Sequence, residues 1–130
     1  MIAVDTSAVV AVVLGEPDAE RYLAALQATE TKMSLVSMVE AAIVVESCQG
    51  ADAARDLRLL VDGAIDDLVA VDASCSEAAI AAWRRFGKGR HPAALNFGDC
   101  FAYAVAQLEG LPLLFKGDDF SQTDLRVALP

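Results

Sequence analysis

Acidic residues in four separate stretches of this sequence have the chemistry to hold a divalent cation. Asp5 directly follows the first apolar run, Glu40 and Asp99 lie near the expected starts of two helices, and Asp118 and Asp119 follow a later apolar run. Carboxylates brought close together raise one another's pKa unless a cation compensates their charge. Mg²⁺ prefers such oxygen ligands, and it activates water and neutralises charge on a phosphoryl oxygen. The pattern therefore predicts a metal-dependent phosphodiesterase site.

Each acid also has a purely structural interpretation. Glu40 fits a helix cap, Asp99 favours the dipole of a first helical turn, and Asp118 and Asp119 suit an ordinary turn. Asp5 is harder to explain in this way, because an acid that ends an apolar strand is costly to bury unless it is paired or bound to metal. The prediction rests on the convergence of these acids and not on any one of them.

The elements that must position these acids alternate along the chain. Short apolar runs at 2–4, about 33–36, 68–71 and 113–115 predict strands. Longer helical patterns separate them, as in a parallel sheet covered by helices, and the last residues are expected to add a short edge strand. In such sheets ligands bind outside the carboxyl ends of the strands, which is where the acids fall. We expect one α/β domain over residues 1–130.

Polar residues mark where the helices begin. Ser7 is expected to cap the first helix, and Ser37 and Glu40 form an S-x-x-E capping box. Ser74 and Asn96 are each expected to cap a later helix. The predicted helices cover about 7–14, a segment beginning near Pro17, 37–48, 51–64, a segment following Ser74, and 97–109. The helix N-termini beside Glu40 and Asp99 are expected to keep these two acids ionised.

The overall charge of −9 disfavours a polyanionic partner, but the basic residues are unevenly distributed. Arg84, Arg85, Lys88 and Arg90 place four of the ten lysines and arginines in one short segment. Because the acids call for a phosphate partner, we expect this segment to guide an RNA backbone. Ser7 and Asn96 lie close enough to the acids to orient water or phosphate, although a capping role is the simpler interpretation for both.

The composition also indicates where the protein works. Hydrophobic residues make up 55% of the sequence, which supports a core of ordinary size, and no apolar run is long enough to span a bilayer. The first ten residues lack the basic start of a secretory signal. The three cysteines Cys48, Cys75 and Cys100 are widely spaced, which argues against disulfides or a zinc site and predicts buried thiols. We therefore expect a cytoplasmic protein that does not contact membranes.

Three motifs resemble those of PIN-domain ribonucleases, specifically the VapC toxins of bacterial VapBC toxin–antitoxin pairs. They are MIAVDTSAVVAVVLGEP, SMVEAAIVVES and LNFGDCFAYAVAQLEGLPLLFKGDDFSQTDL, and together they span nearly the whole chain in the expected order. The resemblance implies a three-layer α/β/α fold, a central, mainly parallel sheet of four to five strands, and endoribonuclease activity that depends on Mg²⁺ or Mn²⁺. It implies cleavage of tRNA or rRNA to inhibit translation, a homodimer, neutralisation by a cognate VapB antitoxin, and promoter DNA binding only through the antitoxin complex.

The resemblance assigns the acids to roles, with one departure from the family pattern. Asp5, Glu40 and Asp99 match the first three acids of the family. Many PIN domains carry a fourth acid two residues after a Thr that ends the last strand, whereas Gly117 occupies that position here. We expect Asp118, in preference to Asp119, to replace it. Asp5 and Asp99 are then predicted to ligate Mg²⁺ directly, while Glu40 and Asp118 hold a second ion or its waters.

Two alternatives from other classes stay open on the sequence alone. A phospho-acceptor receiver module is also an acidic, Mg²⁺-binding α/β domain, but it requires adjacent acids after the first strand, where this chain has Asp5 and Thr6. A catalytically silent interaction subunit is the second alternative, in which the acids only cap helices and solvate the surface.

Overall fold

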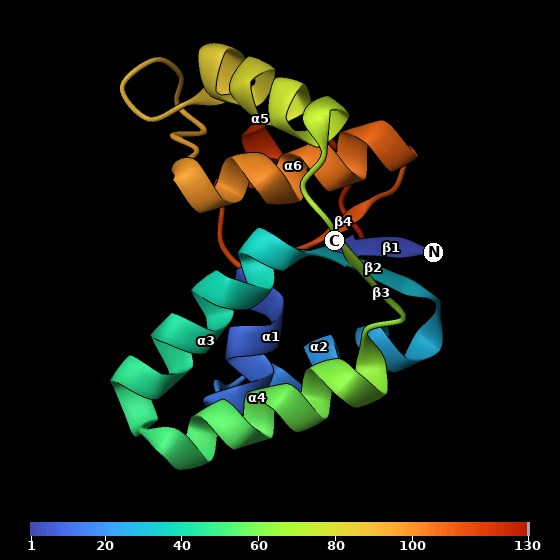
Figure 1. Cartoon of the computed structure of the whole chain (residues 1–130), viewed down its shortest axis with the longest axis vertical. Coiled ribbons are helices and arrows are strands. Elements are labelled where there is room, and N and C mark those ends of the chain that lie inside the picture. The colour runs from blue at the N-terminus through green and yellow to red at the C-terminus, as the bar shows by residue number, and fades with distance from the viewer. Residues whose placement is uncertain (130) are drawn as a thin grey trace.

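The first strand, β1 (Ile2–Val4), directs its side chains into two different cores. Ile2 and Val4 belong to one buried cluster, whereas Ala3 between them belongs to the other. This alternation follows from the two-residue period of a strand, and it requires that both faces of the sheet be covered. The computed structural model, which describes residues 1–129, accordingly has three layers, with the sheet between two groups of helices (Figure 1).

The sheet contains four parallel strands in the order β3-β2-β1-β4. The other three strands are β2 (Thr31–Ser34), β3 (Asp67–Val69) and β4 (Leu113–Leu114). The expected strand at the end of the chain is limited to a single parallel bridge between Val127 and Leu113. Because the strands are parallel, their carboxyl ends meet at one edge of the sheet. The α/β fold class predicted from the sequence is therefore confirmed.

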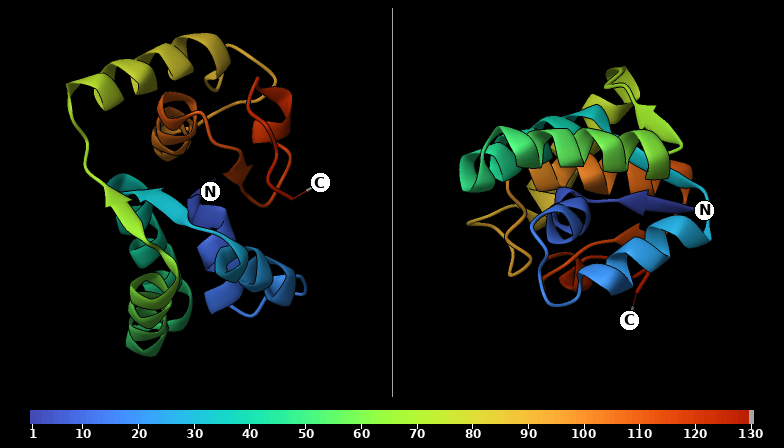
Figure 2. Two further views of the ribbon diagram at one scale, coloured as in Figure 1. Left: turned by 90° about the vertical axis from the view of Figure 1, so that its right-hand side faces the viewer. Right: turned by 90° about the horizontal axis from the view of Figure 1, so that it is seen from below.

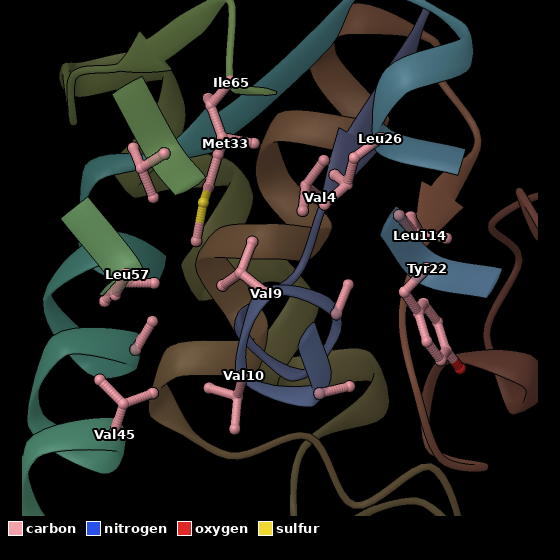
Figure 3. Packing of buried hydrophobic residues seen from close by; sticks show 14 of the residues in the cluster. Val4, Val9, Val10, Tyr22, Leu26, Met33, Val45, Leu57, Ile65 and Leu114 are labelled. Carbon is pink, nitrogen blue, oxygen red and sulfur yellow. The ribbon is translucent and has the colours of Figure 1, made fainter. Parts of the chain in front are cut away.

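One group of helices covers each face of the sheet (Figure 2, left). The first group is α1 (Thr6–Val13), α2 (Ala19–Ala28), α3 (Leu35–Gln49) and α4 (Ala51–Ala64), and the second is α5 (Ala73–Phe86) and α6 (Phe97–Glu109). A short 3-10 helix, Phe120–Gln122, follows β4. Figure 3 shows the core of the first group, where Val9, Met33 and Leu57 are buried between the sheet and the helices.

The starts of α1 and α3 differ from those predicted. The cap of α1 is Asp5, whose carboxylate accepts a hydrogen bond from the backbone N–H of Ser7, so Ser7 lies inside the helix. Ser34 caps α3 through Val36 N–H, so the predicted capping box of Ser37 and Glu40 is wrong. In both places the chain enters the helix as soon as the strand ends, earlier than the serines suggested.

Other predicted features have mixed outcomes. Asp72 caps α5 instead of Ser74, whereas Asn96 caps α6 as expected and α4 spans the predicted residues 51–64. Cys75 and Cys100 are buried, but Cys48 is exposed because it lies on the outer face of α3. Among the described residues, no helix combines the length and apolar character needed to cross a membrane.

A buried hydrogen-bond network at Thr31 joins the start of β2 to the loop after α4. The Thr31 hydroxyl donates to the carbonyl of Ala64 at 2.6 Å and accepts from Asp66 N–H at 3.0 Å, and Asp66 Oδ2 accepts from Thr31 N–H at 2.9 Å. Thr31→Val keeps the shape but leaves buried polar groups without partners. We expect it to lower the free energy of unfolding by about 1–3 kcal/mol in urea titrations. Thr29→Val, outside this network, is the control, and an equal loss there would contradict the assignment.

Candidate active site

Asp5 is the most deeply buried acid at the carboxyl edge of the sheet, with 4% of its surface exposed. Its Oδ2 atom accepts hydrogen bonds from the backbone N–H and the hydroxyl of Ser7, at 3.0 and 2.6 Å. Its Oδ1 atom is buried without a hydrogen-bond partner among the described residues. Burial raises the pKa of Asp5, the bonds from Ser7 oppose that rise, and the nearby charge of Glu40 adds to it.

Ser7 connects Asp5 to the end of β4. Its hydroxyl donates to Asp5 and accepts a hydrogen bond from Lys116 N–H at 2.9 Å. The side chain of Lys116 forms ion pairs with Glu16 at 2.6 Å and with Asp18 at 2.9 Å. Lys116 is therefore neutralised by the loop between α1 and α2, and Ser7 orients the Asp5 carboxylate.

Glu40 lies in the second turn of α3, and the start of that helix is fixed to α1. Thr6, which is buried, donates from its hydroxyl to the carbonyl of Ser37 at 3.1 Å. The carboxylate of Glu40 lies against Gly98 in the first turn of α6. Glu40 thus extends from the helices on one face of the sheet toward the helix that carries Asp99.

Asp99 is held at the start of α6 by a reciprocal capping box with Asn96. Asp99 N–H donates to Asn96 Oδ1 at 2.9 Å, and Asn96 N–H donates to Asp99 Oδ2 at 3.0 Å. Burial raises the pKa of Asp99 to about 7, and the charges of Asp5, Glu40 and Asp119 contribute to that rise. The pKa of Asp99 is therefore raised despite the helix N-terminus, because desolvation and like charges outweigh the hydrogen bond.

The loop after β4 presents two acids, and they differ in their relation to the site. Gly117 takes a positive φ of 107°, which turns the chain before Asp118 and Asp119. Asp119 is the one whose charge contributes to the raised pKa of Asp99. The backbone carbonyl of Asp118 accepts a bond from the Ser121 hydroxyl, and its side chain is exposed. Both side chains are exposed, so the choice between Asp119 and the Asp118 predicted from the sequence stays a prediction, for which the effect of Asp119 on Asp99 favours Asp119.

The four acids Asp5, Glu40, Asp99 and Asp119 thus lie in one region, although they are not packed into a closed cage. Within residues 1–129, no three Asp, Glu, His or Cys side chains are close enough to form a ready-made set of metal ligands. This arrangement suits Mg²⁺, which usually keeps several waters and needs only one or two direct carboxylates. The unpartnered Oδ1 of Asp5 and the disfavoured negative charge of Asp99 both fit a cation.

The basic segment from α5 into the following loop is largely occupied by contacts within the protein. Arg85 pairs with Asp124 at 3.1 Å, and its guanidinium lies 4.6 Å from the centre of the Phe86 ring. Arg90 donates to the carbonyl of Arg84 at 3.0 Å and lies over the ring of Trp83. Arg84 is exposed on the same helix end. These contacts leave Arg85 and Arg90 less available to RNA than the sequence suggested.

Lys88, unlike Arg84, Arg85 and Arg90, lines a groove that reaches the start of α6. This groove of about 670 Å³ lies between α5 and α6 and is also lined by Asn96, Phe97 and Trp83. A neighbouring groove of about 340 Å³ between α3 and α6 is lined by Glu40, Phe97 and Gly98. The acid cluster is therefore flanked by apolar grooves on both sides of Phe97.

Three contributions to this region have little signal in the sequence. The Thr6–Ser37 contact joins residues far apart in the chain. The contribution of Asp119 to the raised pKa of Asp99 depends on the path of the chain after the turn at Gly117, which no local pattern indicates. Gly98 has no side chain to suggest a role, and its contact with Glu40 is seen only in the folded chain.

Comparison with known proteins agrees with this fold. Residues 2–125 match the PIN domain family. Ribonuclease VapC30 of Mycobacterium tuberculosis is 51% identical over 131 residues, covering 99% of this chain and 100% of that protein. The chain therefore belongs to the PIN-domain family, and within it to the VapC ribonucleases.

Two solved structures share the fold at lower sequence identity. The sarcin-ricin loop cleaving toxin VapC20 of Mycobacterium tuberculosis superposes with a TM-score of 0.80 at 19% identity, covering 99% of this chain and 98% of that one. A toxin–antitoxin complex from Klebsiella pneumoniae gives a TM-score of 0.73 at 17% identity, with the same coverage. The family match excludes the receiver module considered from the sequence. In addition, Asp72, the acid near the end of the third strand, caps α5.

The raised pKa of Asp99 predicts that metal-free protein loses stability as the pH rises. The ordinary pKa is 3.8 and that in the folded protein is about 7, so the folded state holds more protons between these values. Asp99→Asn removes this ionisation. At pH 8 in EDTA we expect the variant to be more stable by about 1–2 kcal/mol, allowing for partial solvent screening of this side chain.

The difference between Asp99→Asn and the parent should shrink toward pH 4, where both side chains are neutral. Urea unfolding at several pH values measures it, and Asp118→Asn is the control because the Asp118 side chain is exposed. A variant less stable than the parent at pH 8 would contradict the predicted burial of an unfavourable charge.

Proposed function

We propose that this chain is a toxin endoribonuclease that cleaves structured RNA such as tRNA or rRNA in the cytoplasm, with Asp5, Glu40, Asp99 and Asp119 as its active site. The observation that supports this most strongly is a buried carboxylate, Asp5, whose Oδ1 has no hydrogen-bond partner among the described residues. Asp99 lies in the same region, where burial first and then the charges of Asp5, Glu40 and Asp119 raise its pKa. Such mutual repulsion is a cost to the fold, and a site that works on phosphate with a bound cation gives a reason for it.

Mg²⁺ or Mn²⁺ is the cofactor that fits these residues. Asp5 and Asp99 would hold it most directly, and Glu40 and Asp119 would hold its waters or a second ion. When bound, such an ion supplies an activated water and neutralises charge on the phosphate. The preference for these metals follows from the donor set, which consists of carboxylate oxygens without histidine or thiolate.

The surrounding residues then position the acids and the RNA. Ser7 holds the Asp5 carboxylate through two hydrogen bonds, and Asn96 holds Asp99 through the capping box. Lys88, which shares a groove with Asn96, is the cation best placed to contact the RNA backbone. Arg84 extends this positive surface along α5, while Arg85 and Arg90 stabilise the loop through Asp124 and Trp83.

The activity is proposed to be controlled by a VapB-type antitoxin. The structural neighbour from Klebsiella pneumoniae is a toxin–antitoxin complex, which supports a partner of this kind. Promoter DNA would be bound only through the complex with the antitoxin.

A homodimer is proposed to form through an exposed apolar face on α3 and the start of α6. Val39 and Ile43, one helical turn apart, are 58% and 62% exposed, and Phe97 is 77% exposed. All three line the groove between α3 and α6. Exposed apolar patches of this kind usually mark an interface.

Removal of single carboxylates tests the active site. We expect Asp99→Asn and Asp5→Asn to lower the rate of RNA cleavage by about 100-fold or more, because the cation loses a direct ligand. Both proteins should stay folded by circular dichroism, and Mn²⁺ should raise the melting temperature of the parent but not of Asp99→Asn. Undiminished cleavage by folded Asp99→Asn would overturn the proposed site.

The fourth acid is tested by a matched pair of neighbouring substitutions. Asp119→Asn should reduce cleavage and weaken the response to Mn²⁺, whereas Asp118→Asn should leave both close to the parent. The two residues share the same exposed loop, so a general effect of loop charge would lower both activities alike. The reverse ranking would restore Asp118 as the fourth acid.

Dimerisation is tested by placing a charge on the proposed face. We expect Ile43→Glu to convert a dimer into a monomer in light scattering coupled to gel filtration. Leu59→Glu is the control, because Leu59 is 72% exposed on α4, away from this face. A parent protein that is monomeric at micromolar concentration, or an Ile43→Glu variant that remains dimeric, would contradict the assignment.

A further inference from the structure

Gly98 lies in the first turn of α6, between the cap Asn96 and the acid Asp99. It is buried, and a Cβ atom built on it would lie 2.6 Å from Glu40 Oε2 and 2.7 Å from Glu40 Oε1. Contacts under about 3 Å are much shorter than the 3.5–4.0 Å at which nonbonded carbon atoms pack. The carboxylate of Glu40 therefore occupies the space that any side chain at position 98 would fill.

The backbone at Gly98 does not itself require glycine. Its φ lies in the helical range, unlike Gly117 and Gly110, whose positive φ values are strained for other residues. Gly63, which is also helical, has open space where a Cβ would lie. Glycine lowers helix stability, so its presence at position 98 calls for another reason, and the contact with Glu40 supplies one.

The helix that carries Glu40 is fixed, so a side chain at position 98 would displace the carboxylate and not the helix. Ser34 caps α3, and Thr6 holds its first turn through the carbonyl of Ser37. The end of a glutamate side chain, in contrast, rotates freely about several bonds. A methyl group at position 98 would therefore move the Glu40 carboxylate with little strain on the backbone.

We infer that Gly98 is a positioning residue for the RNA-cleaving reaction, because its missing side chain lets the Glu40 carboxylate lie beside Asp99. The inference rests on the proposed function of Glu40 and adds a residue that touches neither metal nor RNA. Gly98 acts only through Glu40, and this dependence separates it from a residue that merely supports the fold.

A double-mutant cycle between positions 98 and 40 tests the inference. In the parent background, we expect Gly98→Ala to slow RNA cleavage by about 10-fold to 100-fold, the range associated with misplacing a catalytic group by an ångström. It should also raise the Mn²⁺ concentration needed for half-maximal rate. In the Glu40→Ala background, where the conflict is absent, Gly98→Ala should cause no further loss. Gly63→Ala is the control and should leave cleavage unchanged.

Three outcomes would overturn the inference. The first is a Gly98→Ala variant as active as the parent, and the second is a loss by the same factor in both backgrounds. The third is failure of both Gly98→Ala and the double variant to fold by circular dichroism. If Gly98→Ala fails to fold while the double variant folds, the contact is supported, because removal of the Glu40 side chain then restores folding. If the parent does not cleave RNA, the proposed function fails, while coupling of the two positions in melting temperature still reports on the contact.

Discussion

Residues 5–7 hold together the carboxyl edge of the sheet, and the site depends on their hydrogen bonds. Asp5 N–H donates to Leu114 in β4, Thr6 donates to the first turn of α3, and Ser7 joins the Asp5 carboxylate to Lys116 N–H. Two strands and two helices are thereby fixed around one buried carboxylate. Burying a carboxylate is costly, and here only one of its two oxygens has a hydrogen-bond partner. The fold is organised around a group that favours a cation.

At this edge of the sheet, the residues that cap helices are also acids of the proposed active site. Asp5 is both the cap of α1 and a buried acid of the site. Asp99 forms half of a capping box, and its pKa is raised by burial and by the other carboxylates. A cap fixes the orientation of a side chain through backbone hydrogen bonds, and that is the preorganisation an active site needs. The same residues therefore accept hydrogen bonds from the N–H groups at the helix N-termini and hold their carboxylates in fixed orientations.

The sequence predicts elements well where the signal is local. The Asn96 cap and Gly110 define α6, and the limits of α4 are also as predicted, because glycine and polar caps mark helix ends directly. The predicted starts of α1 and α3 are wrong because serines near each strand end are equally good candidates for the cap. The residue at which a strand ends also depends on its neighbours in the sheet, which a local pattern does not show.

The residues of the site also divide into those that local sequence patterns predict and those that only the folded chain reveals. Asp5, Glu40 and Asp99 could be found from their positions after strands and at helix starts. The partner of Arg85 is Asp124, 39 residues away, and the effect of Asp119 on Asp99 depends on how the chain turns after β4. Pairings of this kind arise from tertiary structure, so no local pattern indicates them.

The two separate cores on either side of the sheet have a consequence for how the activity is lost. Asp5 and Glu40 belong to the half built from α1–α4, whereas Asp99 belongs to the half built from α5 and α6. Proteins often open in cooperative parts well before they unfold completely. Partial opening of either half would separate the carboxylates while the other half stays native. The enzyme would therefore lose its cleavage activity before the whole chain unfolds.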